Sequence, residues 1–359
     1  GIPAWGIPRT YGFFTVYFAS AVCLTAAVLS FFFCIPFTTA ESRAFTMPDV
    51  PIINQVINSV SSDRHGFDGR GKIAMVAWIC VLGAIVAPIM SAFFNSEGAL
   101  VMPIISAFFL GLSIVLLLRA YGDIDWVMDR AVAPFFKLIP VQVVTNTTFG
   151  VAYNTMNNVL ISQSCQCDTR IIGGTSQVNG TFMTVFNSVA ILIFTPFLNY
   201  VIIPRLNDFN IDFTIRRKLI SGFVIAGAAM LSAALVEVWR KKAPLALDSN
   251  GEIATSDCAI GPNGNLPMSS LSLWWMLLPF TLIGFGEVLI NVTLYDYTFS
   301  AAPVNMRVLA QGFQLLCQGS MSSSFSVVLN LLMESWNTHA DNNHNNLEFV
   351  YVIFGMVQF

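Results

Sequence analysis

The chain has 359 residues, of which 55% are hydrophobic and only 10% are charged, and its formal net charge is -3. Soluble domains carry about 25% charged residues, so this composition excludes an ordinary soluble domain and predicts an integral membrane protein. The small net charge gives no reason to expect nucleic acid as a partner. The first residue is Gly, and the last apolar run stops at Phe359 before it reaches the roughly 20 residues of a spanning helix. We therefore expect a fragment of a longer chain.

The chain begins with a predicted membrane helix, within residues 1–37, which is aromatic and apolar from Tyr11 to Phe37. A polar segment, 38–72, follows and is predicted to be cytoplasmic. Within it, residues 50–60 carry apolar side chains at helical spacing. This pattern fits either a short interfacial helix or a solvated linker.

Residues 73–119 predict a helical membrane hairpin, because two apolar runs, 73–94 and 99–118, are joined by only four residues. Further apolar runs between residues 132 and 359 predict a C-terminal helix bundle whose last helix is truncated. These runs cover 132–153, 182–203 (closed by Pro204), 219–239, a stretch from 273 to about 302, 308–333, and a final run that begins at Leu347.

The run 132–153 carries more polar residues than the neighbouring runs and continues through three asparagines, Asn154, Asn157 and Asn158. Polar groups in a spanning helix usually face the protein interior or a water-filled cavity, so this helix is a candidate cavity wall. Hydrogen bonding between helices is the alternative explanation. The polar side chains within the run are Lys137, Gln142, Thr145, Asn146, Thr147 and Thr148.

One carboxylate, Glu287, lies near the middle of the apolar run that begins at residue 273. A charge at the bilayer centre costs roughly 2.5 to 3.5 kcal/mol, so Glu287 is a candidate functional residue. The adjacent Gly284 and Gly286 would let another helix or a ligand approach the backbone closely. The alternative is a purely structural Glu that holds helices together. The helix is predicted to end just before Pro303.

The seven cysteines do not predict a disulfide framework, since four lie in apolar runs. The other three, Cys165, Cys167 and Cys258, fall in loops that we expect outside the cell, where a bridge is possible. A zinc site is disfavoured because Cys165 and Cys167 are separated by a single residue and no His is near. The residues therefore predict no metal and no other cofactor.

Basic residues are distributed unequally between the two predicted membrane sides. Twelve of the seventeen, Arg216, Arg217 and Arg307 among them, fall on the side predicted to be cytoplasmic by the positive-inside rule. The cluster Arg240-Lys241-Lys242 on the other side is an exception. A glycosylation sequon at Asn179 is also expected outside, close to the membrane.

The stretch Leu282-Ile283-Gly284-Phe285-Gly286-Glu287-Val288, with a following aromatic pair, Ala302-Pro303 and Met306-Arg307, resembles the tenth-helix signature of one transporter family. This is the proton-coupled oligopeptide transporter family of the major facilitator superfamily, which includes plant nitrate and peptide transporters. The resemblance covers about residue 135 to the end. It implies an all-α polytopic membrane protein: the C-terminal half of a major facilitator fold, preceded by one or more helices.

The resemblance also suggests roles for the helices before residue 132. Residues 1–37 would correspond to the sixth helix of the family, and the hairpin at 73–119 to an inserted helix pair. The alternative assigns these three runs to helices four, five and six. Both assignments place the C-terminal bundle in the same orientation, so the sequence leaves the choice open.

The resemblance implies a substrate site at the centre of the fold. Glu287 matches an acid that contacts the amino terminus of a bound peptide, and Asn187 matches an Asn that contacts peptide backbone. Tyr153 matches a cavity position that is His in a nitrate-transporting relative, which argues mildly against nitrate. Asn154 stands where many members carry an acid used in proton coupling, and an amide does not titrate. Asn157 shares a helix face with Tyr153 and is expected in the same space.

The predicted function is secondary active transport, by proton-coupled symport of di- or tripeptides or related small nitrogenous solutes through alternating access. The expected partners are the small-molecule substrate, protons, the lipid bilayer and a missing N-terminal half of the same chain. Alternatives are a carrier of nitrate or another organic anion, and a non-transporting receptor on the same fold. An enzyme is disfavoured because all three histidines, His65, His339 and His344, fall in loops.

Overall fold

The computed structural model describes residues 70–91, 96–121, 133–170, 177–248, 251–261, 264–302, 307–326 and 347–358. All of them belong to the compact unit Ile52–Phe359. The helix predicted within 1–37 and the segment predicted at 38–72 lie outside the described residues, apart from the last turn of the latter.

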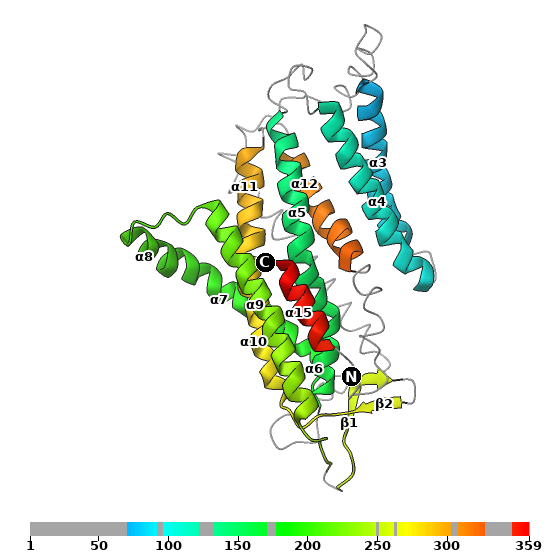
Figure 1. Ribbon diagram of the computed structural model, residues 1–359, viewed down its shortest axis with the longest axis vertical. Helices are drawn as coiled ribbons and strands as arrows, with labels where there is room; N and C mark the ends of the chain where they lie inside the picture. The colour runs from blue at the N-terminus through cyan, green and yellow to red at the C-terminus, as the bar shows by residue number, and fades with distance from the viewer. Residues whose placement is uncertain are drawn as a thin grey trace, which may run out of the picture. The chain divides into compact units, whose positions relative to one another are not determined.

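Helices form most of the described chain (Figure 1). In chain order they are α3 (Arg70–Ser91), α4 (Ser96–Tyr121), α5 (Ala133–Thr155), α6 (Ile161–Gln166), α7 (Thr184–Phe197), α8 (Ile203–Asp208), α9 (Ile215–Lys242), α10 (Leu277–Glu287), α11 (Thr293–Ala301), α12 (Arg307–Leu316) and α15 (Leu347–Gln358). Four π-helical turns continue these helices: η4 (Met156–Leu160), η6 (Leu198–Ile202), η8 (Val288–Val292) and η10 (Cys317–Met321). Two 3₁₀ turns, η5 (Gly180–Met183) and η7 (Leu273–Met276), open helices.

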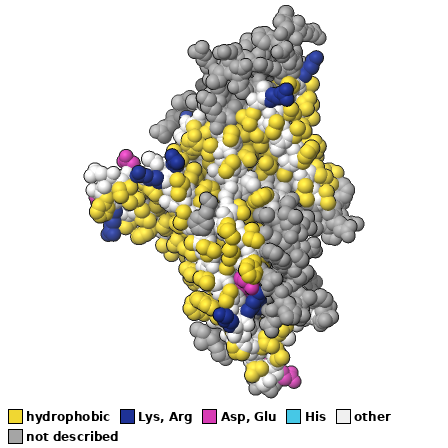
Figure 2. All heavy atoms as spheres, in the orientation of Figure 1, with side chains coloured by type: hydrophobic (Ala, Val, Ile, Leu, Met, Phe, Trp, Pro, Cys, Tyr) yellow, Lys and Arg dark blue, Asp and Glu magenta, His cyan; other side chains and the backbone are white. Residues whose placement is uncertain are grey.

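Three of the described helices are long and apolar enough to cross a membrane: Gly180–Asp208, Ile215–Lys242 and Leu273–Ala301. Shorter apolar helical stretches cover Lys72–Ala87, Ile104–Arg119 and Leu347–Gln358. Hydrophobic side chains are spread over most of the described face, with few charged ones between them (Figure 2). This surface suits lipid rather than water.

Helices α3 and α4 pack side by side and run antiparallel. Ser106 of α4 donates to the Ala84 carbonyl of α3 at 2.6 Å, and Gly83 lies against the Phe109 ring. Ser106 also shares a hydrogen bond of 2.8 Å with Ser320 of η10. This buried hydroxyl therefore ties the hairpin to the helix that continues from α12.

The main core joins α5, α9, α10 and α15. Small residues allow the backbones to approach: a Cβ at Gly222 of α9 would lie 2.5 Å from Ile290 of η8. Such contacts between small residues are the usual basis of helix packing in membranes. The largest fully buried side chains here are Tyr351, Phe280, Phe354, Met156, Leu160, Met183 and Met230.

Two predicted helix ends can be compared with the structure. The end before Pro303 is confirmed: α11 stops at Ala301, and Ala302 is extended, as the residue before a proline prefers. The prediction that Pro204 closes the apolar run 182–203 is wrong, because the helix continues to Asp208. Pro204 lies in the first turn of α8, directly after the π-helical turn η6, where a missing N–H is tolerated.

A small β-hairpin, which was not predicted, lies in the connection between α9 and η7. Strands β1 (Thr255–Gly261) and β2 (Gly264–Pro267) pair antiparallel. One isolated bridge, from Asp168 to Ser272, joins the same connection to the segment after α6. We call this end of the bundle the disulfide end, for the bond described below, and the opposite end the Arg307 end.

Candidate functional site

Glu287 is the last residue of α10, immediately before the π-helical turn η8. Asn187 of α7 donates from Nδ2 to Glu287 Oε2 at 3.3 Å. Asn291, one turn further along η8, is also within hydrogen-bonding reach of the carboxylate. A π-helical turn shifts the side-chain register, and such turns are frequent at functional sites. Glu287 and Asn291, four residues apart on one helix, thus reach the same point.

Two glycines bring the neighbouring helices close to Glu287, and the predicted close approach is confirmed. A Cβ at Gly284 would lie 2.7 Å from the Asn187 carbonyl oxygen of α7. A Cβ at Gly286 would lie 3.3 Å from the Gly222 carbonyl oxygen of α9. Gly284 therefore sets the distance at which Asn187 meets the carboxylate, whereas Gly286 faces the other side.

Two tyrosines lie near the carboxylate, on different helices. Tyr153 of α5 and Tyr295 of α11 are each within electrostatic range of Glu287. Asn157 of η4 is within hydrogen-bonding reach of Tyr153, and Tyr295 Oη donates to Gln318 Oε1 at 3.2 Å. We call Glu287, Asn187, Asn291, Tyr153 and Tyr295 the Glu287 site.

Asn154 points to a different set of partners. Its Nδ2 donates to Ser322 Oγ at 3.3 Å and to Ser326 Oγ at 3.2 Å, both in the helix that continues from η10. Its carbonyl accepts a hydrogen bond of 3.0 Å from Asn158 Nδ2. The structure therefore brings Glu287, Asn187, Tyr153 and Asn157 together and directs Asn154 into a contact between helices.

Sequence reasoning missed two members of the Glu287 site. Asn291 follows Glu287 by four residues, a spacing that places both on one helix face and could have found it. Tyr295 follows by four more and belongs to the aromatic pair of the family signature. Neither carries a signal as strong as an intramembrane charge, which explains why Glu287 was found first.

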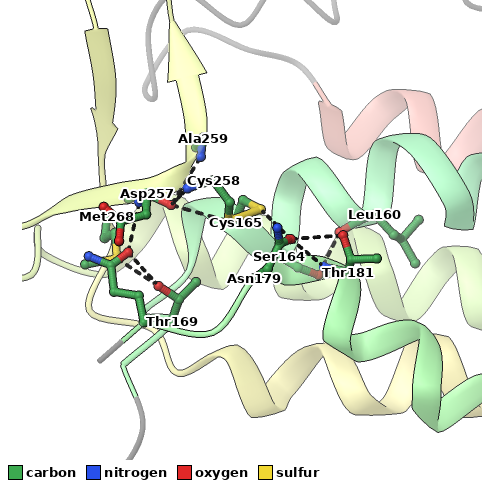
Figure 3. Close-up of a disulfide and its surroundings, with 12 residues drawn as sticks. Leu160, Ser164, Cys165, Thr169, Asn179, Thr181, Asp257, Cys258, Ala259 and Met268 are labelled. Carbon is green, nitrogen blue, oxygen red and sulfur yellow. Dashed lines mark hydrogen bonds between the residues drawn. A yellow bond between two sulfur atoms is a disulfide. The ribbon is translucent and has the colours of Figure 1, made fainter. Parts of the chain in front are cut away.

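A disulfide between Cys165 and Cys258 closes the disulfide end (Figure 3). Cys165 lies in the last turn of α6 rather than in a loop, and Cys258 lies on β1. Asn179 accepts hydrogen bonds from Thr181 N and Thr181 Oγ1 at 3.0 and 2.9 Å beside it. Cys167 is free, and burial raises the pKa of its thiol to about 12. A pocket of about 480 Å³ adjoins the disulfide, and uncharged side chains line it.

Three ion pairs lie at the disulfide end. Burial alone would raise the pKa of Asp168, but its hydrogen bonds with Arg170, at 2.8 to 3.1 Å, hold that pKa below its usual value. Arg240 is fully buried against Glu237, with two hydrogen bonds of 2.6 and 2.8 Å. Lys241 forms an ion pair with Glu348 of α15. The basic cluster that runs against the charge bias is thus largely neutralised.

Within the described residues, no group of three or more His, Cys, Asp or Glu side chains is arranged to hold a metal ion. The Glu287 site is built instead from one carboxylate, amides and phenols. These groups can bind a cationic or hydrogen-bonding solute without a metal.

The fold and this site define a polytopic α-helical membrane protein with a polar site among its helices. The family model described as POT family matches residues 132–345, and the chain belongs to that family. A probable peptide transporter, ptr2 of Schizosaccharomyces pombe, is 25% identical over 188 residues, which are 52% of this chain and 26% of that protein. Protein NRT1/PTR FAMILY 2.9 of Arabidopsis thaliana is 26% identical over 234 residues, 62% of this chain and 38% of that protein.

Solved structures of POT family transporters share the fold. An auto-inhibited POT family peptide transporter superimposes with a TM-score of 0.56 at 19% identity, covering 80% of this chain and 51% of that one. The POT family transporter PepTSo gives a TM-score of 0.53, also at 19% identity, over 81% of this chain and 53% of its own. The chain thus spans about a quarter to two fifths of its curated relatives and about half of the solved transporters.

Proposed function

We propose that the complete protein is a secondary active transporter that carries di- or tripeptides, or related small nitrogenous solutes, by proton-coupled alternating access. Membership of the POT family supports a transporter of the peptide or nitrate type. The observation that carries the proposal within this chain is the pairing of Glu287 with Asn187, flanked by two tyrosines, inside an apolar helix.

The Glu287 site suits a substrate with a free amine. A carboxylate inside the membrane is stabilised by a neutralising partner, which can be a substrate ammonium group or a proton. Tyr153 and Tyr295 offer aromatic faces that attract the same cation. Asn187 donates to Glu287, while its Oδ1 is buried without a partner among the described residues and could accept a substrate N–H. Glu287 thus offers one position at which proton and substrate occupancy can be linked.

We further propose that the disulfide end faces outside and the Arg307 end faces the cytoplasm. Disulfides persist in oxidising compartments, so the Cys165–Cys258 bond supports this orientation. The basic residues at the disulfide end argue against it less than their number suggests. Arg240 and Lys241 are both paired with carboxylates.

The alternative functions that the sequence leaves open differ in what the Glu287 site must bind. A carrier of nitrate or another anion would have to place its substrate near the Glu287 carboxylate, which repels it unless a proton or cation intervenes. A receptor on the same fold would bind peptide without moving it. An enzyme lacks support in the POT family relatives, which carry transporter names.

The test uses the full-length protein in liposomes. Radiolabelled dipeptides and tripeptides are offered outside with an inward proton gradient, and uptake is measured with and without a protonophore. We expect accumulation that the protonophore abolishes. Peptide binding without uptake would indicate a receptor, and uptake of nitrate in place of peptide would contradict the proposed substrate class.

A further inference from the structure

Helices α5 and α12 face each other through side chains spaced four residues apart. Gln142 Nε2 donates to the Ala310 carbonyl at 3.3 Å, and Asn154 Nδ2 donates to Ser322 Oγ at 3.3 Å. These two contacts show that the helices run parallel, and residues four apart share a helix face. The facing positions are Gln142, Asn146, Gly150 and Asn154 on α5, and Ala310, Gln314, Gln318 and Ser322 on α12 and its continuation.

In the part of this contact nearer the disulfide end, the two helices touch and the polar side chain of Asn154 has hydrogen-bond partners. A Cβ at Gly150 would lie only 1.9 Å from Ser322 Cβ, so the two helices touch there. Asn154 reaches both Ser322 and Ser326 directly. No bridging molecule is needed at this level.

In the part nearer the Arg307 end, the polar side chains are buried but several of their amide atoms lack hydrogen-bond partners. Gln142 and Gln314 are 0% exposed and Asn146 is 2% exposed. Gln142 Oε1, Asn146 Oδ1 and both amide atoms of Gln314 have no hydrogen-bond partner among the described residues. Each such group costs about 1 to 3 kcal/mol if it stays unpaired. We call Gln142, Asn146 and Gln314 the inner seam.

Water fits these requirements better than direct pairing does. Gln142 Nε2 is engaged with Thr298 Oγ1 at 3.1 Å and the Ala310 carbonyl at 3.3 Å, and one N–H of Asn146 is engaged with the Gln142 carbonyl at 2.8 Å. Three amide oxygens, the NH₂ of Gln314 and one N–H of Asn146 therefore remain, and a buried water typically makes two to four hydrogen bonds to groups of this kind. Polar groups buried in this number are normally satisfied by ordered water when protein partners are lacking.

The inner seam leads toward the Glu287 site. Gln318 lies one turn beyond Gln314, and its Oε1 accepts the hydrogen bond from Tyr295. Tyr295 is in turn within electrostatic range of Glu287. Along α5, the eleven residues from Gln142 to Tyr153 rise about 16 Å at 1.5 Å per residue. Polar side chains thus extend from the Glu287 site toward the Arg307 end.

We propose that ordered water occupies the inner seam and carries protons between Glu287 and the Arg307 end of the bundle. This inference rests on the proposed function. A protonated Glu287 gives its proton to the water chain, which releases a proton at the Arg307 end, and Glu287 is left as a carboxylate. The titratable groups near Glu287 among the described residues are Tyr153 and Tyr295, and the inner seam itself contains only amides.

The water is tested on the unmodified full-length protein by X-ray radiolytic footprinting in H₂¹⁸O. Cys317 is 0% exposed in the hydrophobic cluster that contains Ala310 and Phe313, and it lies three residues from Gln314, on the same helix face. Met230 is also 0% exposed, in the main core, and serves as the control. We expect ¹⁸O incorporation at Cys317 and none at Met230. Equal labelling of the two, at any level, would overturn the proposal.

The proton path is tested with two variants of Gln314 in liposomes. Gln314→Leu removes the polar group at nearly constant size, whereas Gln314→Asn keeps an amide. We expect Gln314→Leu to lose about tenfold in proton-driven accumulation, equivalent to about 1.4 kcal/mol in the barrier. Substrate counterflow, which needs no net proton movement, should persist, and Gln314→Asn should retain both.

If Gln314→Leu loses both counterflow and accumulation, or keeps both, the proton path is contradicted. A wild-type protein without counterflow would instead contradict the proposed transport function. The footprinting result is independent of both, because it needs neither a variant nor a substrate.

Discussion

Replacing Gly284 by Ala should weaken the Glu287 site through packing alone. The added Cβ would lie 2.7 Å from the Asn187 carbonyl oxygen and 2.9 Å from both Ala190 Cβ and Asn187 Oδ1. These distances fall 0.5 to 0.7 Å short of the 3.4 Å at which ordinary contact begins. Helix α10 must therefore move away from α7. The 3.3 Å hydrogen bond from Asn187 to Glu287 would then exceed hydrogen-bonding distance.

Overpacking of this kind costs about 1 to 3 kcal/mol, and a hydrogen bond to a charged group contributes about 1.5 to 3 kcal/mol. The shift relieves part of the overpacking while it breaks the bond, and Ala favours the helix over Gly by about 0.8 to 1 kcal/mol, so we expect a net loss of about 1 to 3 kcal/mol. Thermal unfolding of the full-length protein in detergent, followed by tryptophan fluorescence, measures the loss as a lower melting temperature. Uptake should fall as well.

Gly286→Ala is the matched control, two residues along the same helix. Its Cβ would lie 3.3 Å from the Gly222 carbonyl oxygen and 3.5 Å from Ala226 Cβ, distances that need almost no adjustment. Ala also favours the helix over Gly by about 0.8 to 1 kcal/mol. Gly286→Ala should therefore melt close to the wild type. Equal destabilisation by the two substitutions would refute this reasoning.

Three further predictions concern the disulfide end and the orientation. Because the folded-state pKa of Asp168 is lowered, its pairing with Arg170 contributes stability above the unfolded pKa of about 3.9 and loses it as pH falls further. The melting temperatures of wild type and Asp168→Asn should thus differ at pH 7 and converge below about pH 4; a constant difference would contradict this. Cys258→Ser should lower the melting temperature, because the bond closes a separation of 93 residues; an unchanged melting temperature would contradict this. An impermeant thiol reagent should label Cys introduced at Arg216 only after cells are opened, and labelling of intact cells would reverse the proposed orientation.

The helical architecture could be predicted from the sequence because apolar run length sets membrane helices directly. Glu287 was identified because a lone carboxylate in such a run is conspicuous. Its pairing with Asn187 depends on the crossing of α7 and α10 at Gly284, which no local pattern encodes. The resemblance to the family suggested both residues, but not their contact.

The features that escaped prediction depend on longer-range geometry. Asn154 faces Ser322 and Ser326 of the helix that continues from α12, a contact that depends on how two distant helices pack. The choice of Cys258 as the partner of Cys165 depends on the β-hairpin, whose connection reads as an irregular loop in the sequence. The buried ion pair of Glu237 with Arg240 also depends on tertiary structure. Counting basic residues in the sequence treats Arg240 as a solvated charge.

We propose that Glu287 receives the amine of the substrate, and one substitution tests this directly. Glu287→Gln removes the carboxylate with little change in shape, and it is compared with wild type in liposomes for uptake of one dipeptide with a free amino terminus and its N-acetylated analogue. We expect the substitution to reduce uptake of the free-amine peptide much more than that of the blocked one, because only the former loses an ion pair. Equal losses for the two peptides, or no loss for either, would return Glu287 to a structural role between helices.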